Sequence, residues 1–201
     1  FFPAIEEGDF FTIELIVKNK SEEEQAKFKV APTLSPQEFQ KEVQDETKTP
    51  RRDIFHPDFT FGTFVVGQAN QLAHAACYSV AEKPGKAVNP LFVCGPSGTG
   101  KTHLLNAIGN YVREKYPNIR ICYISGERFL NDFVSSMRHG QMDKFRQRYR
   151  ERYDFLIVDD IHIIAGKDAT QEEFFYTYNV YHDAGKQVVV ASDKLPREMV
   201  G

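Results

Sequence analysis

The chain has 201 residues, which is enough for one globular domain with a small appendage but too few for two full α/β domains. Hydrophobic residues make up 41% of the chain and charged residues 26%, which excludes disorder and collagen, and no apolar stretch reaches the roughly eighteen residues of a membrane span. The net charge of −3 excludes the strong basic field that usually holds DNA, so we expect any contact with nucleic acid to be local or to lie on a part outside this chain.

The first fifty residues have the character of an appendage. The β-branched and aromatic stretch 10–17 predicts a strand, and the acidic segment that begins at Ser21 predicts the start of a helix. We interpret residues 1–30 as a small α+β remnant of an N-terminal domain, and because residue 1 is Phe we expect a piece of a longer protein. Residues 31–53 hold prolines among polar side chains, and this composition predicts a flexible linker.

From residue 54 onward, patterns typical of helices and strands alternate. Short apolar runs bounded by Gly or Pro predict buried strands of a parallel sheet, and longer segments with one apolar stripe predict helices. The predicted helices are 68–82, 102–115, 127–137, 142–151 and 171–182, and the predicted strands are 91–94, 119–124, 155–158 and 187–191. This alternation predicts a three-layer α/β domain with a mostly parallel sheet over residues 54–201.

The chain has three cysteines, Cys77, Cys94 and Cys122. They form no Cys-x-x-Cys pair and have no histidines at the spacing of metal ligands. We expect reduced, buried thiols in a cytoplasmic protein.

The strongest chemical signal lies at residues 95–102, which match the phosphate-binding pattern G-x-x-x-x-G-K-[ST] in full. The glycines let the backbone bring successive N–H groups around phosphate oxygens, at the positive end of the following helix. Lys101 would supply charge to the β and γ phosphates, and the Thr102 hydroxyl would ligand Mg²⁺. The alternative is a Gly-rich turn with an exposed lysine. The residues assigned to ATP or ADP are Gly95, Pro96, Ser97, Gly98, Thr99, Gly100, Lys101 and Thr102.

Two carboxylates follow the apolar strand 155–158. Ligands of open α/β sheets bind at the carboxyl ends of strands, and we expect the strands of these acids and of the phosphate loop to be neighbours. Asp159 is then placed to hold Mg²⁺, through water, and Asp160 to orient an attacking water. The alternative is a pair of solvated acids at the start of a loop.

The strand 187–191 also ends in polar residues. In P-loop ATPases an extra strand often lies between the loop strand and the acidic strand and brings a polar sensor of the γ-phosphate. Asp193, or in second place Ser192, would be this sensor. The alternative is a helix cap or turn before Pro196.

Basic and aromatic residues interleave at 144–152. Such interleaving suits single-stranded DNA. The alternative is a solvated helix whose cations favour its C-terminal end. The sequence does not decide between these two interpretations.

Four segments, 59–67, 89–93, 100–110 and 170–175, closely resemble the bacterial chromosomal replication initiators of the DnaA family. The resemblance extends from about residue 54 to residue 201. Helicase loaders and regulators of initiation share the phosphate loop but match less well around Gln-Glu-Glu-Phe-Phe at the end of the last segment.

The resemblance implies an AAA+ domain that binds ATP or ADP with Mg²⁺, oligomerises on origin DNA with ATP, melts the duplex and is switched off by slow hydrolysis. The residues to which we assign catalytic roles are Lys101, Asp160 and Asp193. The residues that the resemblance assigns to adenine are Val66, Gly67 and Asn70. The helices 127–137 and 142–151 would line a channel for single-stranded DNA, with Val134 and Lys167 at positions that the family uses.

The resemblance also implies parts that this chain does not supply. The helical lid, with an arginine finger and a second sensor, and the domain that binds duplex DNA would follow Gly201. Residues 1–30 would belong to a domain that binds the replicative helicase or regulators, and phospholipid is a further candidate partner of this nucleoid-associated protein. One departure weakens the DNA assignment, because Ala169 stands where relatives often have a basic residue.

Two rival functions remain open. One is a stand-alone helicase loader or regulatory ATPase of the same superfamily, although the linker and upstream strand argue against a protein that begins at the core. The other is a nucleotide-dependent interaction module with negligible hydrolysis. Turnover of ATP with and without DNA would separate this module from a weak ATPase that serves as a switch.

Overall fold

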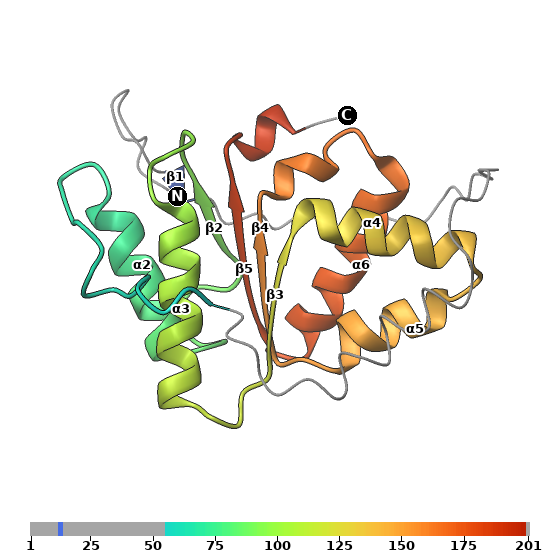
Figure 1. The fold of residues 1–201 in the computed structure, drawn as a ribbon, viewed down its shortest axis with the longest axis horizontal. Helices are drawn as coiled ribbons and strands as arrows, with labels where there is room; N and C mark the ends of the chain where they lie inside the picture. Colours follow the sequence, from blue (N-terminus) through green and yellow to red (C-terminus); the bar gives the residue numbers. More distant parts are fainter. Residues whose placement is uncertain (1–11, 14–54, 200–201) are drawn as a thin grey trace.

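The computed structural model describes residues 12–13 and 55–199 (Figure 1). The predictions for the N-terminal remnant, the helix start at Ser21 and the linker 31–53 lie outside the described residues. Of the predicted strand 10–17, the described part is the two-residue strand β1 (Thr12–Ile13).

A five-stranded sheet forms the middle layer of the molecule, in the order β1-β2-β5-β4-β3. Its four strands in the described core are β2 (Leu91–Cys94), β3 (Ile121–Ser125), β4 (Phe155–Asp159) and β5 (Gln187–Ser192). These four strands are mutually parallel, and β1 pairs with β2 in the antiparallel sense. The mostly parallel sheet is therefore confirmed, with each predicted core strand in place to within two residues at either end.

Helices cover both faces of this sheet (Figure 1). One face carries α2 (Gln71–Glu82) and α3 (Lys101–Lys115), and the other carries α4 (Gly126–Arg138), α5 (Met142–Arg146) and α6 (Asp168–Asp183). Short helical turns complete the described chain: a π-helix η1 (Gln147–Glu151) and the 3₁₀ helices η2 (Ile161–Ile164) and η3 (Pro196–Glu198). The three-layer α/β fold is confirmed. No helix in the described ranges is both long and apolar enough to cross a membrane.

The two faces of the sheet build two separate hydrophobic cores. Alternate residues of a strand point to opposite faces, so Phe155 and Ile157 of β4 belong to the core under α2 and α3, whereas Leu156 and Val158 belong to the core under α4, α5 and α6. All four side chains are fully buried. This double burial explains the continuous apolar runs of the strands. The three cysteines are buried in these cores, as predicted.

The strand order corrects one prediction and confirms another. The strands of the phosphate loop and of the acidic pair are not neighbours, because β5 hydrogen-bonds to both β2 and β4 and separates them. The expected extra strand between them is therefore present. Neighbouring strands lie about 4.8 Å apart. Since β5 lies between the strands of the two motifs, the motifs can meet only through their side chains.

Three helix boundaries differ from the prediction by more than one residue. The helix α2 begins at Gln71 rather than at residue 68, because the N–H groups of Asn70 and Gln71 both donate to the Gly67 carbonyl and close a turn first. The helix α6 begins three residues before the predicted start, at Asp168. The predicted helix 142–151 is α-helical only at its start and continues as η1, a distinction that apolar periodicity does not resolve.

Candidate nucleotide-binding site

The phosphate loop connects the end of β2 to the start of α3, as expected of this motif. Gly98 and Gly100 have φ values of 81° and 96°, in the left-handed region that favours glycine. Thr99 closes the loop on itself, because its hydroxyl donates to the Pro96 carbonyl at 2.8 Å. A Cβ at Gly100 would come within 2.8 Å of the Phe64 ring, so this ring packs closely on the end of the loop. Pro96, Ser97 and Gly98 are exposed, whereas Gly95 is buried.

Lys101 turns back under the loop and is only 5% exposed. Its Nζ donates to the carbonyl oxygens of Gly95 and Pro96, at 2.7 and 2.9 Å. The same Nζ lies 2.5 Å from the Asp193 carboxylate at the end of β5. The Ser192 hydroxyl instead donates to the Lys194 carbonyl at 2.7 Å. Of the two candidate sensors, Asp193 is thus the residue that meets the phosphate-loop lysine.

Asp159 is 5% exposed at the end of β4 and accepts three hydrogen bonds. The hydroxyls of Thr102 and Tyr123 both donate to its Oδ2, at 2.8 and 3.1 Å. The backbone N–H of Asp160 donates to its Oδ1 at 3.0 Å. A carboxylate beside a hydroxyl supplies the oxygen ligands that Mg²⁺ prefers, so the two residues assigned to the metal are adjacent and fit the ion.

Asp160 has a strained backbone, with φ at 52°. Burial raises the pKa of its carboxyl above the usual value, and the neighbouring Asp159 raises this pKa further. Its carboxylate, the ring of His162 and the carboxylate of Asp193 have ligand atoms within 4.8 Å of one another. Gly126 permits the close approach of α4, because a Cβ there would lie 2.6 Å from the Asp160 carbonyl oxygen.

Sequence reasoning missed two of these residues, Tyr123 and His162. Tyr123 looks like any aromatic residue of a strand, and no motif distinguishes it. His162 follows the acidic pair by two positions, and its ring nitrogen lies 3.4 Å from the backbone nitrogen of Asp193. That proximity depends on η2 folding the chain back over the ends of β4 and β5, which local sequence does not reveal.

The three residues assigned to adenine lie together before α2. The side chain of Asn70 accepts a hydrogen bond from the Gly67 N–H at 2.7 Å and donates to the Val65 carbonyl at 3.0 Å. Val66 is 46% exposed between them. Asn70 therefore shapes the loop that presents Val66 and Gly67.

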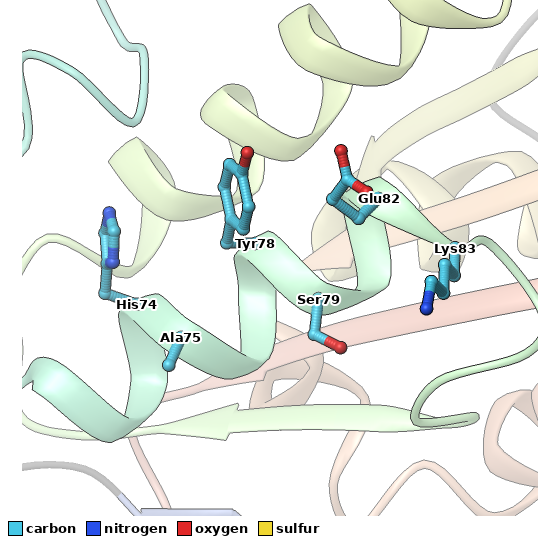
Figure 2. Close-up of a pocket in the computed structure, with 6 residues that line it drawn as sticks. All are labelled: His74, Ala75, Tyr78, Ser79, Glu82 and Lys83. Carbon is cyan, nitrogen blue, oxygen red and sulfur yellow. The ribbon is translucent and has the colours of Figure 1, made fainter.

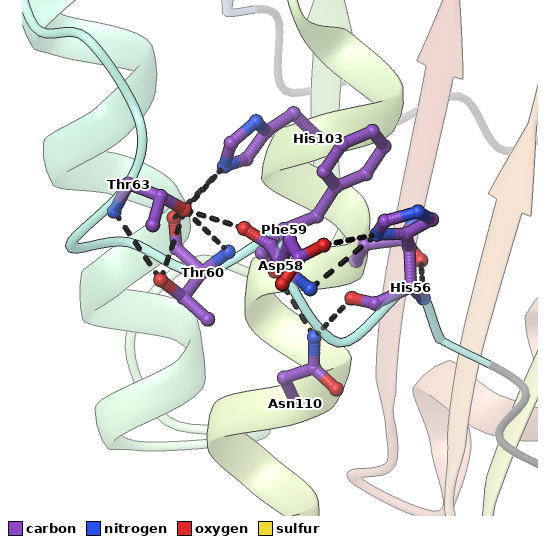
Figure 3. Close-up of polar contacts among 8 residues, drawn as sticks. His56, Asp58, Phe59, Thr60, Thr63, His103 and Asn110 are labelled. Atoms are coloured by element: carbon purple, nitrogen blue, oxygen red, sulfur yellow. Dashed lines mark hydrogen bonds and ion pairs between the residues drawn. The ribbon is translucent and has the colours of Figure 1, made fainter.

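The segment that precedes this loop lies across α3 (Figure 3). The Asn110 side chain donates to the carbonyls of His56 and Phe59, at 2.9 and 3.0 Å. The His103 ring lies 2.8 Å from the Thr60 carbonyl and stacks on Phe59 at a centroid distance of 4.7 Å. Since His103 directly follows Thr102, this segment is attached to the first turn of the phosphate-loop helix.

A hollow of about 480 Å³ lies on α2, beyond the adenine-assigned loop (Figure 2). It is lined by His74, Ala75, Tyr78, Ser79, Glu82 and Lys83. No residue assigned to nucleotide, metal or DNA lines it. The hollow is therefore separate from the site at the carboxyl ends of the strands.

Three of the four arginines in the basic run are held in ion pairs, whereas the fourth, Arg152, is exposed at the end of the run. Arg146 and Arg150 both contact the Glu173 carboxylate on α6, which is 7% exposed in its side chain. Arg148 lies 3.4 Å from the Asp132 carboxylate on α4. These contacts attach the α5–η1 segment to both of its neighbouring helices.

The two residues assigned to DNA are not brought together by a common contact. Val134 is half-buried on α4 and packs against the core under α4, α5 and α6. Lys167 is exposed and directly precedes α6. Of the two, only Lys167 presents a charged side chain to solvent.

Comparison with known proteins places this geometry in one family. The family model of the bacterial DnaA ATPase domain matches residues 55–201. The chain is similar to the chromosomal replication initiator protein DnaA of Bdellovibrio bacteriovorus, with 51% identity over 160 residues that cover 79% of this chain and 34% of the relative. It is also similar to the same-named protein of Thermodesulfovibrio yellowstonii, with 50% identity over 78% of this chain and 36% of the relative. The chain thus spans about a third of the length of these relatives.

Solved structures agree with this placement. Domain III of the Thermotoga maritima replication initiation protein DnaA aligns with a TM-score of 0.71 and 47% identity, over 76% of this chain and 61% of that one. AMPPCP-bound DnaA from Aquifex aeolicus aligns with a TM-score of 0.69 and 36% identity, over 74% and 45%. The DnaC helicase loader shares only the fold, with a TM-score of 0.58 and 20% identity over 73% and 81%. This chain belongs to the bacterial DnaA ATPase domain family.

Proposed function

We propose that this chain is the nucleotide-binding core of a replication initiator, which binds ATP or ADP with Mg²⁺ and hydrolyses ATP slowly. The observation that carries the proposal is the convergence of Lys101, Thr102, Asp159 and Asp193 at the carboxyl ends of three strands, in a chain of the DnaA ATPase domain family. Solved relatives described as AMPPCP-bound support adenine nucleotide as the ligand.

Each side chain has a distinct part in this proposal. Lys101 places its charge beside the β and γ phosphates, and Asp193 senses the γ-phosphate through Lys101. Thr102 and Asp159 would hold Mg²⁺, which neutralises developing phosphate charge when it is bound. Asp160, directly after the metal-assigned Asp159, orients the attacking water.

Hydrolysis by this chain should be slow, for two reasons. Asp160 stands where many AAA+ enzymes have Glu, so its carboxylate reaches one methylene less far toward the water, and small misplacements lower rates by on the order of a hundredfold. An arginine supplied in trans raises rates by about 10³–10⁵ in related hydrolases, and a single copy of the chain has no neighbour to supply one. Slow turnover suits a switch that holds ATP long enough to assemble.

Isothermal titration and single-turnover hydrolysis test the proposal. Lys101→Ala should weaken both ATP and ADP. Asp159→Ala should weaken binding chiefly in the presence of Mg²⁺, whereas Asp160→Ala should leave affinity intact and lower an already small turnover. Wild-type affinity in the Lys101 variant would refute the nucleotide site. Unchanged turnover in the Asp160 variant would favour a non-hydrolysing interaction module.

We propose further that origin DNA and other copies of the initiator are partners of the whole protein. A solved relative is described as DnaA bound to AMPPCP and single-stranded DNA, with a TM-score of 0.68 and 35% identity over 74% of this chain and 46% of that one. Three arginines of the basic run are engaged in ion pairs, and Lys167 is exposed, so Lys167 is a candidate contact of this core. Sedimentation should find this chain monomeric with ATP, and a stable ATP-dependent filament would contradict that expectation.

A further inference from the structure

Tyr123 brings a phenol to the metal-assigned carboxylate from a strand that carries none of the predicted site residues. It lies in the middle of β3, and its side chain packs on the core under α2 and α3. The Phe55 ring meets the tyrosine ring edge-to-face at a centroid distance of 5.5 Å. From there the hydroxyl reaches Oδ2 of Asp159 at 3.1 Å. The phenol is thus held by packing on one side and by the carboxylate at its tip.

The surrounding hydrogen bonds fix the direction of the phenol proton. Asn106 is 4% exposed, and its Oδ1 accepts from the backbone N–H of His56 at 2.9 Å. Its Nδ2 therefore faces the Thr102 carbonyl, at 2.7 Å, and the Tyr123 oxygen, at 3.4 Å. Because an amide nitrogen only donates, the Tyr123 oxygen accepts from Asn106, and its single proton goes to Asp159.

We propose that Tyr123 is a positioning residue for the magnesium site. Its hydroxyl holds the Asp159 carboxylate in the orientation that Mg²⁺-dependent nucleotide binding requires. The inference rests on the proposed function, because it assumes ATP and Mg²⁺ at this site. Asp159 has three donors, and two of them come from Thr102 and the backbone of Asp160. Tyr123 is the donor whose removal leaves the phosphate loop, the acidic pair and the backbone intact.

The expected effect follows from the general behaviour of groups that orient metal ligands. Loss of such an outer partner lowers metal affinity by about 10–100-fold. Asp159 keeps two donors in Tyr123→Phe, so we expect an effect at the low end of this range. The Mg²⁺ concentration at the midpoint of the Mg²⁺-dependent rise in ATP affinity should increase about tenfold. Affinity for ATP in EDTA should not change, because the hydrogen bonds of the Tyr123 hydroxyl go to Asn106 and Asp159, which lie outside the phosphate loop 95–102.

The experiment measures ATP affinity by titration calorimetry at a series of MgCl₂ concentrations and in EDTA, for wild type and Tyr123→Phe. Tyr149→Phe is the matched control, because the Tyr149 hydroxyl also donates to a carboxylate, that of Asp132, but Tyr149 lies in the other core. Thermal unfolding of both variants measures the stability that each phenol contributes. A second comparison places Tyr123→Phe on an Asp159→Asn background, where the tyrosine should no longer affect the Mg²⁺ dependence.

The outcomes separate the inference from the proposed function. A tenfold shift in Tyr123→Phe alone, lost on the Asp159→Asn background, supports the positioning role. An unchanged Mg²⁺ dependence, an equal loss of affinity in EDTA, or a shift that persists without Asp159 overturns it. If wild type itself binds no ATP, or binds it without regard to Mg²⁺, the proposed nucleotide and metal site fails instead.

Discussion

Glu173→Gln should destabilise the domain far more than the same change at the adjacent Glu172. The Glu173 side chain is 7% exposed and contacts two arginines of the basic run, Arg146 and Arg150. Glutamine keeps the size of the side chain and removes its charge, so both guanidinium groups lose their anionic partner. Glu172 is exposed, and its carboxylate accepts one hydrogen bond, from Tyr176 at 3.2 Å.

The magnitude follows from the exposure of the two arginines. Removing one partner of a fully buried ion pair lowers stability by about 3–5 kcal/mol. Here the Arg146 and Arg150 side chains are 48% and 19% exposed, so water compensates part of the loss and we expect about 1–3 kcal/mol. For a domain of this size, that corresponds to a lower Tm by roughly 2–12 °C. The exposed Glu172→Gln should stay within about 0.5 kcal/mol of wild type.

Urea unfolding followed by circular dichroism, with thermal scans in parallel, measures both variants against wild type. Equal midpoints for the two glutamine variants would refute the view that Glu173 anchors the α5–η1 segment. Binding of single-stranded DNA by Glu173→Gln gives a second readout. If the ion pairs occupy the arginines, releasing them should strengthen binding in low salt, and unchanged binding would show that they were already accessible.

Two further predictions concern backbone contact and pH. Gly126→Ala should lower stability by about 1–3 kcal/mol and slow single-turnover hydrolysis, because the new Cβ would lie 2.6 Å from the Asp160 carbonyl oxygen. Gly62→Ala is the control and should change neither quantity, because the nearest atom to its Cβ would lie at 3.8 Å. Arg120 holds the pKa of Asp154 below its usual value. Stability from this pair is therefore present above the unfolded-state pKa of about 3.9 and is lost as pH falls through the lower folded-state pKa. Asp154→Asn should lower the free energy of unfolding in urea at pH 7 by less than about 1 kcal/mol. The difference from wild type should vanish near pH 2.

The phosphate loop and the acidic pair could be predicted from sequence because their chemistry is local. The glycines, lysine and threonine of the loop lie within eight consecutive positions directly after an apolar strand, and apolar runs flanked by Gly or Pro mark the strands. The position of β5 between β2 and β4 followed from knowledge of P-loop ATPases rather than from the residues, since strand order depends on long-range pairing.

Other features depend on contacts between residues far apart in sequence. The basic run looks solvated in sequence, since Glu173 lies more than twenty positions away and in an exposed-looking Gln-Glu-Glu motif. Tyr123 reaches Asp159 only because β3 and β4 pair in the register that sets Ser125 opposite Asp159. No local pattern carries information about either pairing, so sequence periodicity could not find them.

Ile157 and Val158 are covalent neighbours, yet the sheet places them in different cores. A smaller side chain at Ile157 opens space beneath α2 and α3, whereas one at Val158 opens space beneath α4, α5 and α6. Truncations at these two consecutive positions should therefore add with little coupling, as changes without shared partners generally do. Truncations at Ile157 and Leu105 share one core and should couple, although more than fifty positions separate them. The strand residues on one face of the sheet and the helices that cover this face can therefore change together, largely independently of the core on the other face.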